Sequence, residues 1–417
     1  MNLSVAVLLL VFVAIAARTV DGLRLPIWQI MGLGALAVLV SGQIGPVAAL
    51  RAIDPDVMVF LAAMFLVGTA LERSGYLAQL AARLFQGARS VDRLVLTVLF
   101  GVGAASALLM NDTLAVVGTP LMLMLARTHR IDARMLLLTL AFAVTLGSVM
   151  SPIGNPQNLL IALHGGMNDP FLAFLSYLAL PTALNLLLAY GVLRWRFRSR
   201  FHGDQLVHVP VPVTDPHLAM LARSALRILV LLLVVRIALR WLGLPAPPLS
   251  AAAAAAALPL VIFSPRRGEL MRNIDWSTLV FFAAMFVLMQ SVWDSGFFQG
   301  WMARFDLRID AIPTILVVST LLSQLISNVP LVALYLPMLT HAGGSEAALL
   351  ALAVGSTVAG NLFILGAASN VIIVQGAERR GGPSLSFLEF ASVGVPITVL
   401  SLGVYWGFFH WVYGFTA

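Results

Sequence analysis

The stretch L-L-M-N-D-T-L-A-V-V-G-T-P, residues 108–120, lies in a long apolar region but carries Asn111, Asp112 and Thr113 at its middle. An ionised carboxylate deep in a bilayer costs about 2.5–3.5 kcal/mol on insertion scales, so it is retained where it faces water, a partner or a ligand. A second stretch, L-I-S-N-V-P-L-V-A-L-Y-L-P (residues 325–337), also has an Asn near its centre and a Pro nine residues later. The two stretches predict a pair of re-entrant helical hairpins, each of which enters the membrane and leaves on the same side.

The rest of the sequence is that of a polytopic helical membrane protein. Of its 417 residues, 60% are hydrophobic and 10% are charged, whereas soluble domains carry about 25% charged residues. Apolar runs long enough to span a bilayer recur along the whole chain. The chain has no cysteine, which excludes disulfides, thiolate metal sites and cysteine nucleophiles. The 25 basic residues are all Arg and lie in short loops between spans, which favours cytoplasmic loops over nucleic-acid binding.

The positions of arginine predict the topology. The most basic segment, residues 194–200, follows the last apolar run of the first half. If this segment is cytoplasmic and the hairpins do not cross, each half crosses five times, and the arginines of residues 73–93, 127–134 and 379–380 fall inside. If the hairpins crossed fully, the last two groups would fall outside, against the positive-inside rule. The sequence therefore predicts an inner-membrane protein, surrounded by the lipid bilayer, with periplasmic N- and C-termini.

The two halves are also related in sequence. F-L-A-A-M-F at residues 60–65 resembles F-F-A-A-M-F at 281–286, and G-N-P-Q-N-L-L-I at 154–161 resembles G-A-A-S-N-V-I-I at 366–373. Because the number of crossings per half is odd, the two copies have opposite orientations. The predicted fold is an all-α polytopic membrane protein with two inverted-topology repeats of five transmembrane helices, each with a re-entrant helical hairpin and an unwound helix. This is the layout of a secondary transporter with a midplane site.

The same pattern gives predicted boundaries. The first inverted repeat covers residues 1–194, with its hairpin at about 93–127; a cytoplasmic basic linker covers 195–222; and the second inverted repeat covers 223–417, with its hairpin at about 312–341.

Four breaks in the predicted spans carry the candidate binding groups: the hairpin tips at 111–113 and 327–330 and the unwound segments 151–158 and 366–370. Non-helical backbone at membrane depth is tolerated only where it is buried in protein or lines a cavity, and half-helix N-termini attract anionic or polar ligands there. A lone Asn in a membrane helix is often an interhelical hydrogen bond, but symmetry-related pairs beside Gly and Pro favour a binding role. The predicted substrate-binding residues are Asn111, Thr113, Gly154, Asn155, Gln157, Asn158, Ser327, Asn328, Ser369 and Asn370.

Asp112 is the only acid well inside a span in this topology. It could be a structural acid bonded to an N–H of the hairpin tip, but its position favours a proton acceptor or a cation ligand. No histidine has metal-ligand spacing, so no metal site is predicted apart from a sodium ion near Asp112 and Asn155 as an alternative to the proton. Intramembrane His/Glu sets, paired Asp or a Ser–His constellation would indicate an enzyme, and the spans contain none of these.

At the segments N-D-T-L-A-V-V-G-T-P, G-N-P-Q-N, S-N-V-P-L-V-A-L and G-N-L-F-I-L-G-A-A-S-N the chain resembles the ion transporter superfamily, specifically its ArsB/NhaD-like permeases. The resemblance covers about residues 20–415. It implies a scaffold and a mobile transport domain with two hairpins clasping the substrate. Arsenite permeases of this type export arsenite or antimonite with the proton gradient, and NhaD-type members exchange sodium for protons. Dicarboxylate relatives carry Ser-Asn-Thr at both tips, whereas this chain has Asn-Asp-Thr and Ser-Asn-Val, and an ionised Asp112 would repel a dianion.

Arsenite is mostly a neutral triol at neutral pH, so it requires hydrogen-bond partners more than counter-charges. The absence of cysteine fits this substrate, because a thiolate would hold trivalent arsenic too tightly for release. The resemblance therefore favours an arsenical-resistance antiporter that exports arsenite and antimonite by alternating access, driven by the proton gradient and without other cofactors. The alternatives are a sodium/proton antiporter and another, dicarboxylate-type, anion permease. In some arsenite permeases a soluble ATPase docks on the cytoplasmic side, and the linker at 195–222 would be its place here.

Overall fold

Each half of the chain opens with three apolar helices. The computed structural model describes residues 3–20, 26–85, 87–201, 213–242, 244–297, 300 and 310–415. The opening helices of the first half are α1 (Leu3–Val20), α2 (Ile27–Val40) and α4 (Pro55–Arg73), with the shorter α3 (Pro46–Ala52) and α5 (Tyr76–Phe85) beside them. Those of the second half are α11 (Pro216–Trp241), α12 (Leu249–Phe263) and α14 (Trp276–Asp294), with the short α13 (Arg267–Arg272).

Each half then continues with a hairpin, a broken helix and a final long helix. In the first half these are the hairpin α6 (Val91–Ser106) and α7 (Asn111–His129), the half-helices α8 (Ala133–Ser148) and α9 (Pro156–His164), and α10 (Pro170–Arg196). In the second half they are the hairpin α16 (Ile312–Ile326) and α17 (Asn328–His341), the half-helices α18 (Glu346–Val358) and α19 (Ala368–Arg379), and α20 (Phe387–Gly407). The order of elements is therefore the same in both halves, as the predicted repeat requires.

The lengths of the helices agree with this arrangement. Five described helices, namely α4, α10, α11, α14 and α20, are long and apolar enough to cross a membrane. The helices α8 and α18 are shorter because each is interrupted and followed by a second half-helix. The predicted all-α polytopic fold is confirmed, and no strand occurs in the described ranges.

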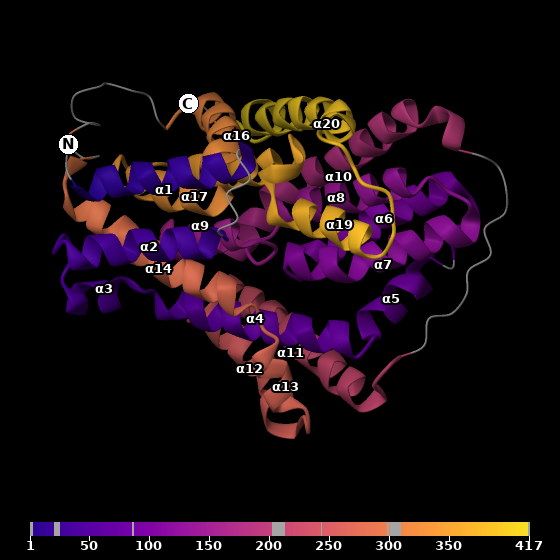
Figure 1. Ribbon diagram of the computed structural model, residues 1–417, viewed down its shortest axis with the longest axis horizontal. Coiled ribbons are helices and arrows are strands. Elements are labelled where there is room, and N and C mark those ends of the chain that lie inside the picture. The colour runs from indigo at the N-terminus through magenta and orange to yellow at the C-terminus, as the bar shows by residue number, and fades with distance from the viewer. Residues whose placement is uncertain are drawn as a thin grey trace.

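The two broken helices form the centre of the molecule. Every residue from 135 to 148 in α8 and from 347 to 358 in α18 is buried. Figure 1 shows α6, α7 and α8 toward one end of the molecule and α16, α17 and α9 toward the other, so the two hairpins enter from opposite ends. The second arm of each hairpin packs on a half-helix of the other repeat, α7 on α19 and α17 on α9.

Local sequence signals explain where several helices begin. Asp54 and Asp132 cap α4 and α8 by accepting hydrogen bonds from Val57 N and Arg134 N, which satisfies first-turn N–H groups.

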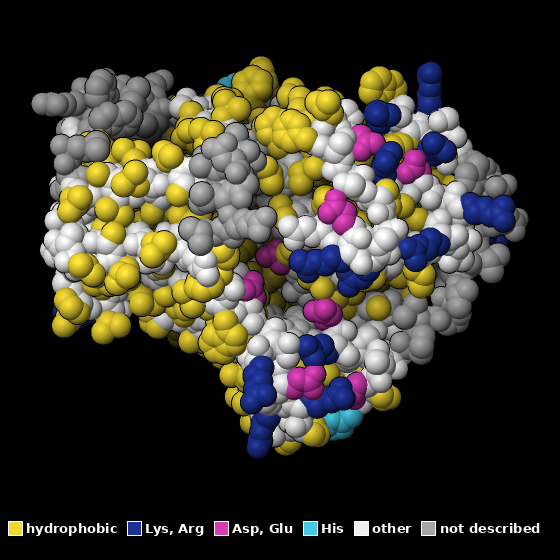
Figure 2. Space-filling view, viewed as in Figure 1, with side chains coloured by type: hydrophobic (Ala, Val, Ile, Leu, Met, Phe, Trp, Pro, Cys, Tyr) yellow, Lys and Arg dark blue, Asp and Glu magenta, His cyan; other side chains and the backbone are white. Residues whose placement is uncertain are grey.

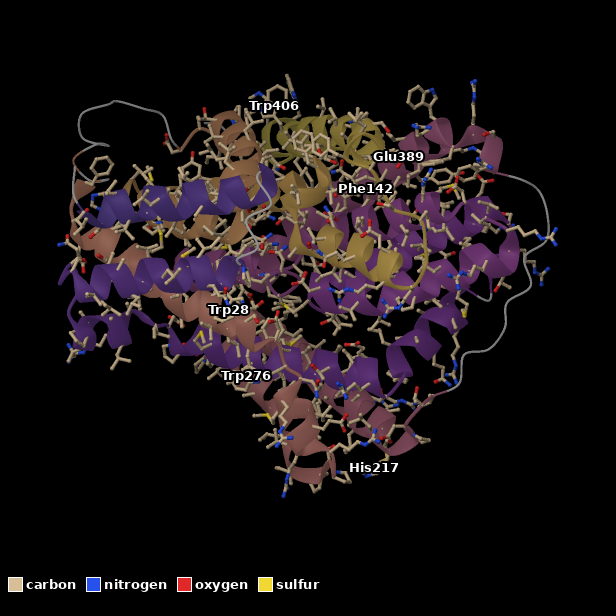
Figure 3. The ribbon with its side chains drawn as sticks, viewed as in Figure 1. Trp28, Phe142, His217, Trp276, Glu389 and Trp406 are labelled. Atoms are coloured by element: carbon tan, nitrogen blue, oxygen red, sulfur yellow. The ribbon has the colours of Figure 1, made fainter. Side chains whose placement is uncertain are left out.

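The start of α20 is held against α8 by an ion pair of 3.0 Å between Arg134 and Glu389. Phe142 packs on Phe390 with ring centroids 5.3 Å apart. Figure 3 labels Phe142 of α8 and Glu389 at the start of α20.

The arginines mark one end of the molecule. In Figure 2 the basic side chains gather over the right-hand and lower parts, where Figure 1 places α5, α13 and the end of α10. Arg51 on α3 and Arg236 near the end of α11 are exceptions, because both lie on the side predicted to be outside. The central part of the predicted linker, residues 202–212, lies outside the described residues, and α11 begins at Pro216. The repeat boundaries and the periplasmic termini stay predictions.

Candidate functional site

The first break, residues 149–155 between α8 and α9, is held by its own polar side chains. Asn155 is the N-cap of α9, where its Oδ1 accepts from Asn158 N at 2.9 Å, and its Nδ2 donates to Ser148 Oγ at 3.0 Å. Asn158 donates to the carbonyl oxygens of Ser148 and Ser151, both at 3.1 Å. These bonds satisfy backbone groups that the broken helix leaves unpaired.

Thr357, on the opposite broken helix, completes the hydrogen bonding of this break. Its Oγ1 accepts from Asn155 Nδ2 at 3.3 Å and Gln157 Nε2 at 3.5 Å. It donates to Asn158 Oδ1 at 3.1 Å. The side chains of Asn155, Gln157 and Asn158 are all buried. In this conformation, three residues predicted to bind substrate are thus bonded to protein and hold the break in shape.

The tip of the first hairpin docks onto the same break. The backbone N–H of Asn111 donates to Gly154 O at 3.2 Å. In the side-chain orientation that gives both the amide nitrogen and the amide oxygen a partner, the nitrogen donates to Gly154 O at 3.0 Å and to Ser106 Oγ at 2.7 Å. A Cβ atom at Gly154 would lie 2.5 Å from Ser106 O, so only glycine allows this approach. Asn111 and Gly154, which are both predicted to bind substrate, are therefore bonded to each other in this structure.

The second break, residues 359–367, consists of two single 3₁₀ turns, η2 (Ala359–Asn361) and η3 (Ile364–Gly366), before α19. Gln324 of α16 donates to Ala359 O at 2.8 Å, and Asn370 donates to Gly360 O at 2.6 Å. The second hairpin, η2 and the first turn of α19 therefore meet at residues 359–360.

Polar atoms without a partner concentrate around this second break. Within the described ranges, no hydrogen bond reaches Asn328 Oδ1, Ser369 Oγ, Asn370 Oδ1 or either end of the Asn361 amide, and the same holds for Ser323 Oγ and Thr145 Oγ1. Asn328 is 8% exposed and the others 1% or less. Each such atom costs about 1–3 kcal/mol when it stays unbonded. A group of this kind is what a polar ligand or bound water would satisfy.

Three of these residues were not among the sequence predictions. Ser323 lies on α16, one turn before the hairpin tip, Asn361 lies in η2, and Thr145 lies on α8 with its methyl group 3.2 Å from the position a Cβ would take at Gly360. The sequence does contain the signal for Ser323 and Thr145, because each has an identical residue at the corresponding place of the other repeat, Ser106 and Thr357.

Ser327 forms the tip of the second hairpin in a strained backbone conformation. Its φ of 72° and ψ of 157° lie in a region that is essentially restricted to glycine, and its side chain makes no capping bond. Such a residue costs about 1–3 kcal/mol and persists only where the surrounding structure imposes it. Strain of this kind occurs at ligand clamps and moving segments, which agrees with the predicted place of Ser327 at the site.

Asp112 and Thr113 begin α7 on the side that faces α4. Asp112 is half-buried, and its carboxylate makes no hydrogen bond or ion pair with the described residues, so the structural alternative of a bond to a tip N–H is not observed. A Cβ at Gly68 of α4 would lie 2.6 Å from Thr113 Oγ1. Figure 2 shows a hollow between the part that contains α7 and α19 and the part that contains α4, with acidic side chains at its margin.

Comparisons with known proteins give consistent results. A model of the CitMHS citrate transporter family matches residues 7–355. The silicon efflux transporter LSI3 of Oryza sativa subsp. japonica is 29% identical in an alignment, gaps included, of 448 positions that covers 90% of this chain and 91% of the relative. A 46 kDa membrane protein of Mycobacterium leprae is 28% identical over 384 residues, with 86% of each chain covered. The YdaH transporter of Alcanivorax borkumensis has a similar fold, with a TM-score of 0.56 at 20% identity over 86% of this chain and 85% of that one.

Proposed function

The chain belongs to the CitMHS citrate transporter family, and from this premise we propose the class of its substrate. It is a secondary transporter of the membrane and not an enzyme. We propose that it exports a small neutral oxyacid, of the class that includes arsenous, antimonous and silicic acid, in exchange for protons.

The observation that carries this proposal is the chemistry of the unpartnered groups at the second break. They are amides and hydroxyls from Asn328, Asn361, Ser369 and Asn370, and they bring no net charge. A neutral oxyacid presents hydroxyl groups that each donate and accept one or more hydrogen bonds, which matches amide oxygens and serine hydroxyls. Hydrogen bonds to these protein groups can offset the free-energy cost of removing water from such a substrate, and no counter-ion is needed because the substrate is neutral.

The relatives support the same chemical class. LSI3 is named for silicon efflux, and silicic acid is a neutral tetrahydroxy acid. Arsenous and antimonous acids, which the resemblance to arsenite permeases favours, are neutral trihydroxy acids with the same donors and acceptors. The proposal therefore concerns the class, and the choice within it is left to measurement.

Asp112 is our candidate for proton coupling. Its carboxylate is half-buried, has no protein partner in the described ranges, and lies in the first turn of α7. A carboxyl group in this setting can take a proton from one side of the membrane and release it to the other, as the start of α7 is exposed first to one side and then to the other. A neutral substrate does not compete with this proton through charge.

Citrate is a second candidate, because the family model is described by it. The N-termini of α17 and α19 point partial positive charge toward the second break, which would favour an anion. An ionised Asp112 nearby would oppose it, so we rank a carboxylate second.

Uptake into everted membrane vesicles energised with a proton gradient tests the proposal. Arsenite, silicic acid, citrate and sodium are compared in wild type and Asp112→Asn, with the element or label measured in filtered vesicles. We expect uncoupler-sensitive accumulation of arsenite or silicic acid in wild type. In Asp112→Asn, accumulation should fall to the level of vesicles without the protein, while exchange down a concentration gradient continues.

The other outcomes each overturn a stated part. Accumulation of citrate alone would remove the neutral-oxyacid proposal, and sodium exchange without either oxyacid would make the protein a sodium/proton antiporter. Gradient-driven oxyacid transport that is undiminished in Asp112→Asn would remove Asp112 from proton coupling.

A further inference from the structure

The two breaks are related by the repeat, yet they differ in how completely they are hydrogen-bonded. An offset of 212 residues, the one that aligns 154–161 with 366–373, also aligns Thr145 with Thr357 and Asn158 with Asn370. Five positions between these pairs differ in polar side chains. The differing pairs are Ser148 and Gly360, Val149 and Asn361, Ser151 and Phe363, Asn155 and Ala367, and Gln157 and Ser369.

In the first break, the residues at these positions complete a network. Thr357 receives hydrogen bonds from Asn155 and Gln157 and gives one to Asn158. The Ser148 hydroxyl receives a further bond from Asn155. A ligand that entered here would have to displace protein–protein hydrogen bonds that are already made.

In the second break, the same substitutions take the donors away. Thr145 is the counterpart of Thr357, but the positions of Asn155 and Gln157 are occupied by Ala367 and Ser369, whose shorter side chains leave Thr145 Oγ1 without a partner in the described ranges. Asn370 keeps only its bond to Gly360 O, and its Oδ1 has none. Asn361 adds a buried amide that bonds to nothing described, where the first repeat has Val149.

The hairpin tips show the same difference. An offset of 217 residues aligns Ser106 with Ser323 and Asn111 with Asn328. In the first repeat this Ser–Asn pair is bonded internally and to Gly154 O. In the second repeat, Ser323 Oγ and Asn328 Oδ1 have no partner within the described residues.

We propose that the two breaks have divided their roles: the first is a closed structural copy, and the second is the substrate-binding copy. The binding set is Thr145, Ser323, Asn328, Asn361, Ser369 and Asn370, so five of its six residues come from the second repeat. The chemical class of the substrate rests on the proposed function, whereas the division of roles rests on the hydrogen bonds alone.

The same substitution at symmetry-related residues tests the division. Thr145→Val and Thr357→Val each replace a hydroxyl with a methyl group of similar volume. Thr357→Val should lower the melting temperature of the purified protein by several degrees and leave the KM unchanged, because it removes three hydrogen bonds to buried amides. Thr145→Val should leave the melting temperature unchanged or raise it, and should raise the KM of the transported oxyacid about tenfold, the equivalent of one hydrogen bond.

Two further variants keep the test decisive. Gln157→Leu removes only the longest bond of the first break and replaces Thr357→Val if that variant does not fold. Ala367→Asn restores the residue that the first repeat has at this position and should provide a donor for Thr145. We expect it to raise the melting temperature and to abolish transport.

Equal shifts in melting temperature for Thr145→Val and Thr357→Val, or wild-type transport by Ala367→Asn, would overturn the division of roles. The comparison of melting temperatures does not depend on which compound is carried, because it is made without substrate. Failure of the wild type to carry any neutral oxyacid would instead overturn the proposed function. The KM values of Thr145→Val and Thr357→Val would then be compared with citrate as the substrate.

Discussion

Ser327 is the residue at which the second hairpin stores backbone strain. Its φ of 72° with ψ of 157° suits glycine, and release of this strain is worth about 1–3 kcal/mol. We expect Ser327→Gly to be more stable than Ser327→Ala by about 1–2 kcal/mol, because the two variants lose the same hydroxyl and only the first relieves the backbone.

Thermal unfolding of the two purified variants measures the difference. A transport defect that is shared by both would report on the hydroxyl, and one that is confined to Ser327→Gly would report on the rigidity of the tip. Equal melting temperatures would show that the backbone at this position is not strained in the protein.

At the same scale, the sequence predicted which polar residues lie at the breaks but not which groups they bond to. Asn155, Gln157 and Asn158 lie at the first break as predicted, but their amides are bonded to Thr357, Ser148 and Ser151. A sequence shows that an Asn lies beside Gly and Pro, but not whether a residue about 200 positions away supplies its partner. Thr145 was missed for the same reason, since its lack of a partner depends on Ala367 and Ser369.

Among the elements, the pairing of α6 with α8 sets the position of the first hairpin. A Cβ atom at Gly147 would lie 2.2 Å from Gly103 O and 2.4 Å from Gly103 Cα, so the two helices touch through backbone. Gly147→Ala must force them apart, at a cost of about 1–3 kcal/mol or more. The tip that carries Asn111 and Asp112 would move with α6.

Gly191→Ala on α10 is a matched control, because nothing lies within 4 Å of its Cβ position and alanine favours the helix by about 1 kcal/mol. We expect Gly147→Ala to lower the melting temperature and the transport rate, and Gly191→Ala to lower neither. Similar behaviour of the two variants, measured by unfolding of the purified proteins, would contradict the close packing of α6 on α8.

For the whole molecule, the absence of native cysteine allows the predicted topology to be tested directly. Single-cysteine variants Ser199→Cys and Asn168→Cys place a thiol at the arginine-rich end and in the loop between α9 and α10. In intact cells, a membrane-impermeant maleimide should label Asn168→Cys and not Ser199→Cys. In everted vesicles the labelling should reverse, since arginine-rich loops stay cytoplasmic. The opposite pattern would invert the predicted topology.

At this scale the sequence predicted most of the fold. The helices, the hairpins and the inverted topology of the repeats were predicted from the apolar runs, the two hairpin tips with a central Asn, and the repeat at 60–65 and 281–286. These signals were enough because a bilayer allows a chain few backbone structures. It could not predict how the repeats interlock. The contacts of α7 with α19 and of α17 with α9 arise from packing between helices that are far apart in the sequence.

This interlocking also bears on how the protein is made. The bond from Thr357 to Asn158 joins residues 199 positions apart, and at about 5–20 residues per second a ribosome needs about 10–40 s to cover that distance. During this interval Ser148 and Ser151 already pair with the amides of Asn155 and Asn158, but Gln157 Nε2 and Asn158 Oδ1 have no partner until Thr357 is made. Completion of the first break therefore has to wait for α18 to be inserted, and a chain that stops earlier would leave these two atoms without their partner.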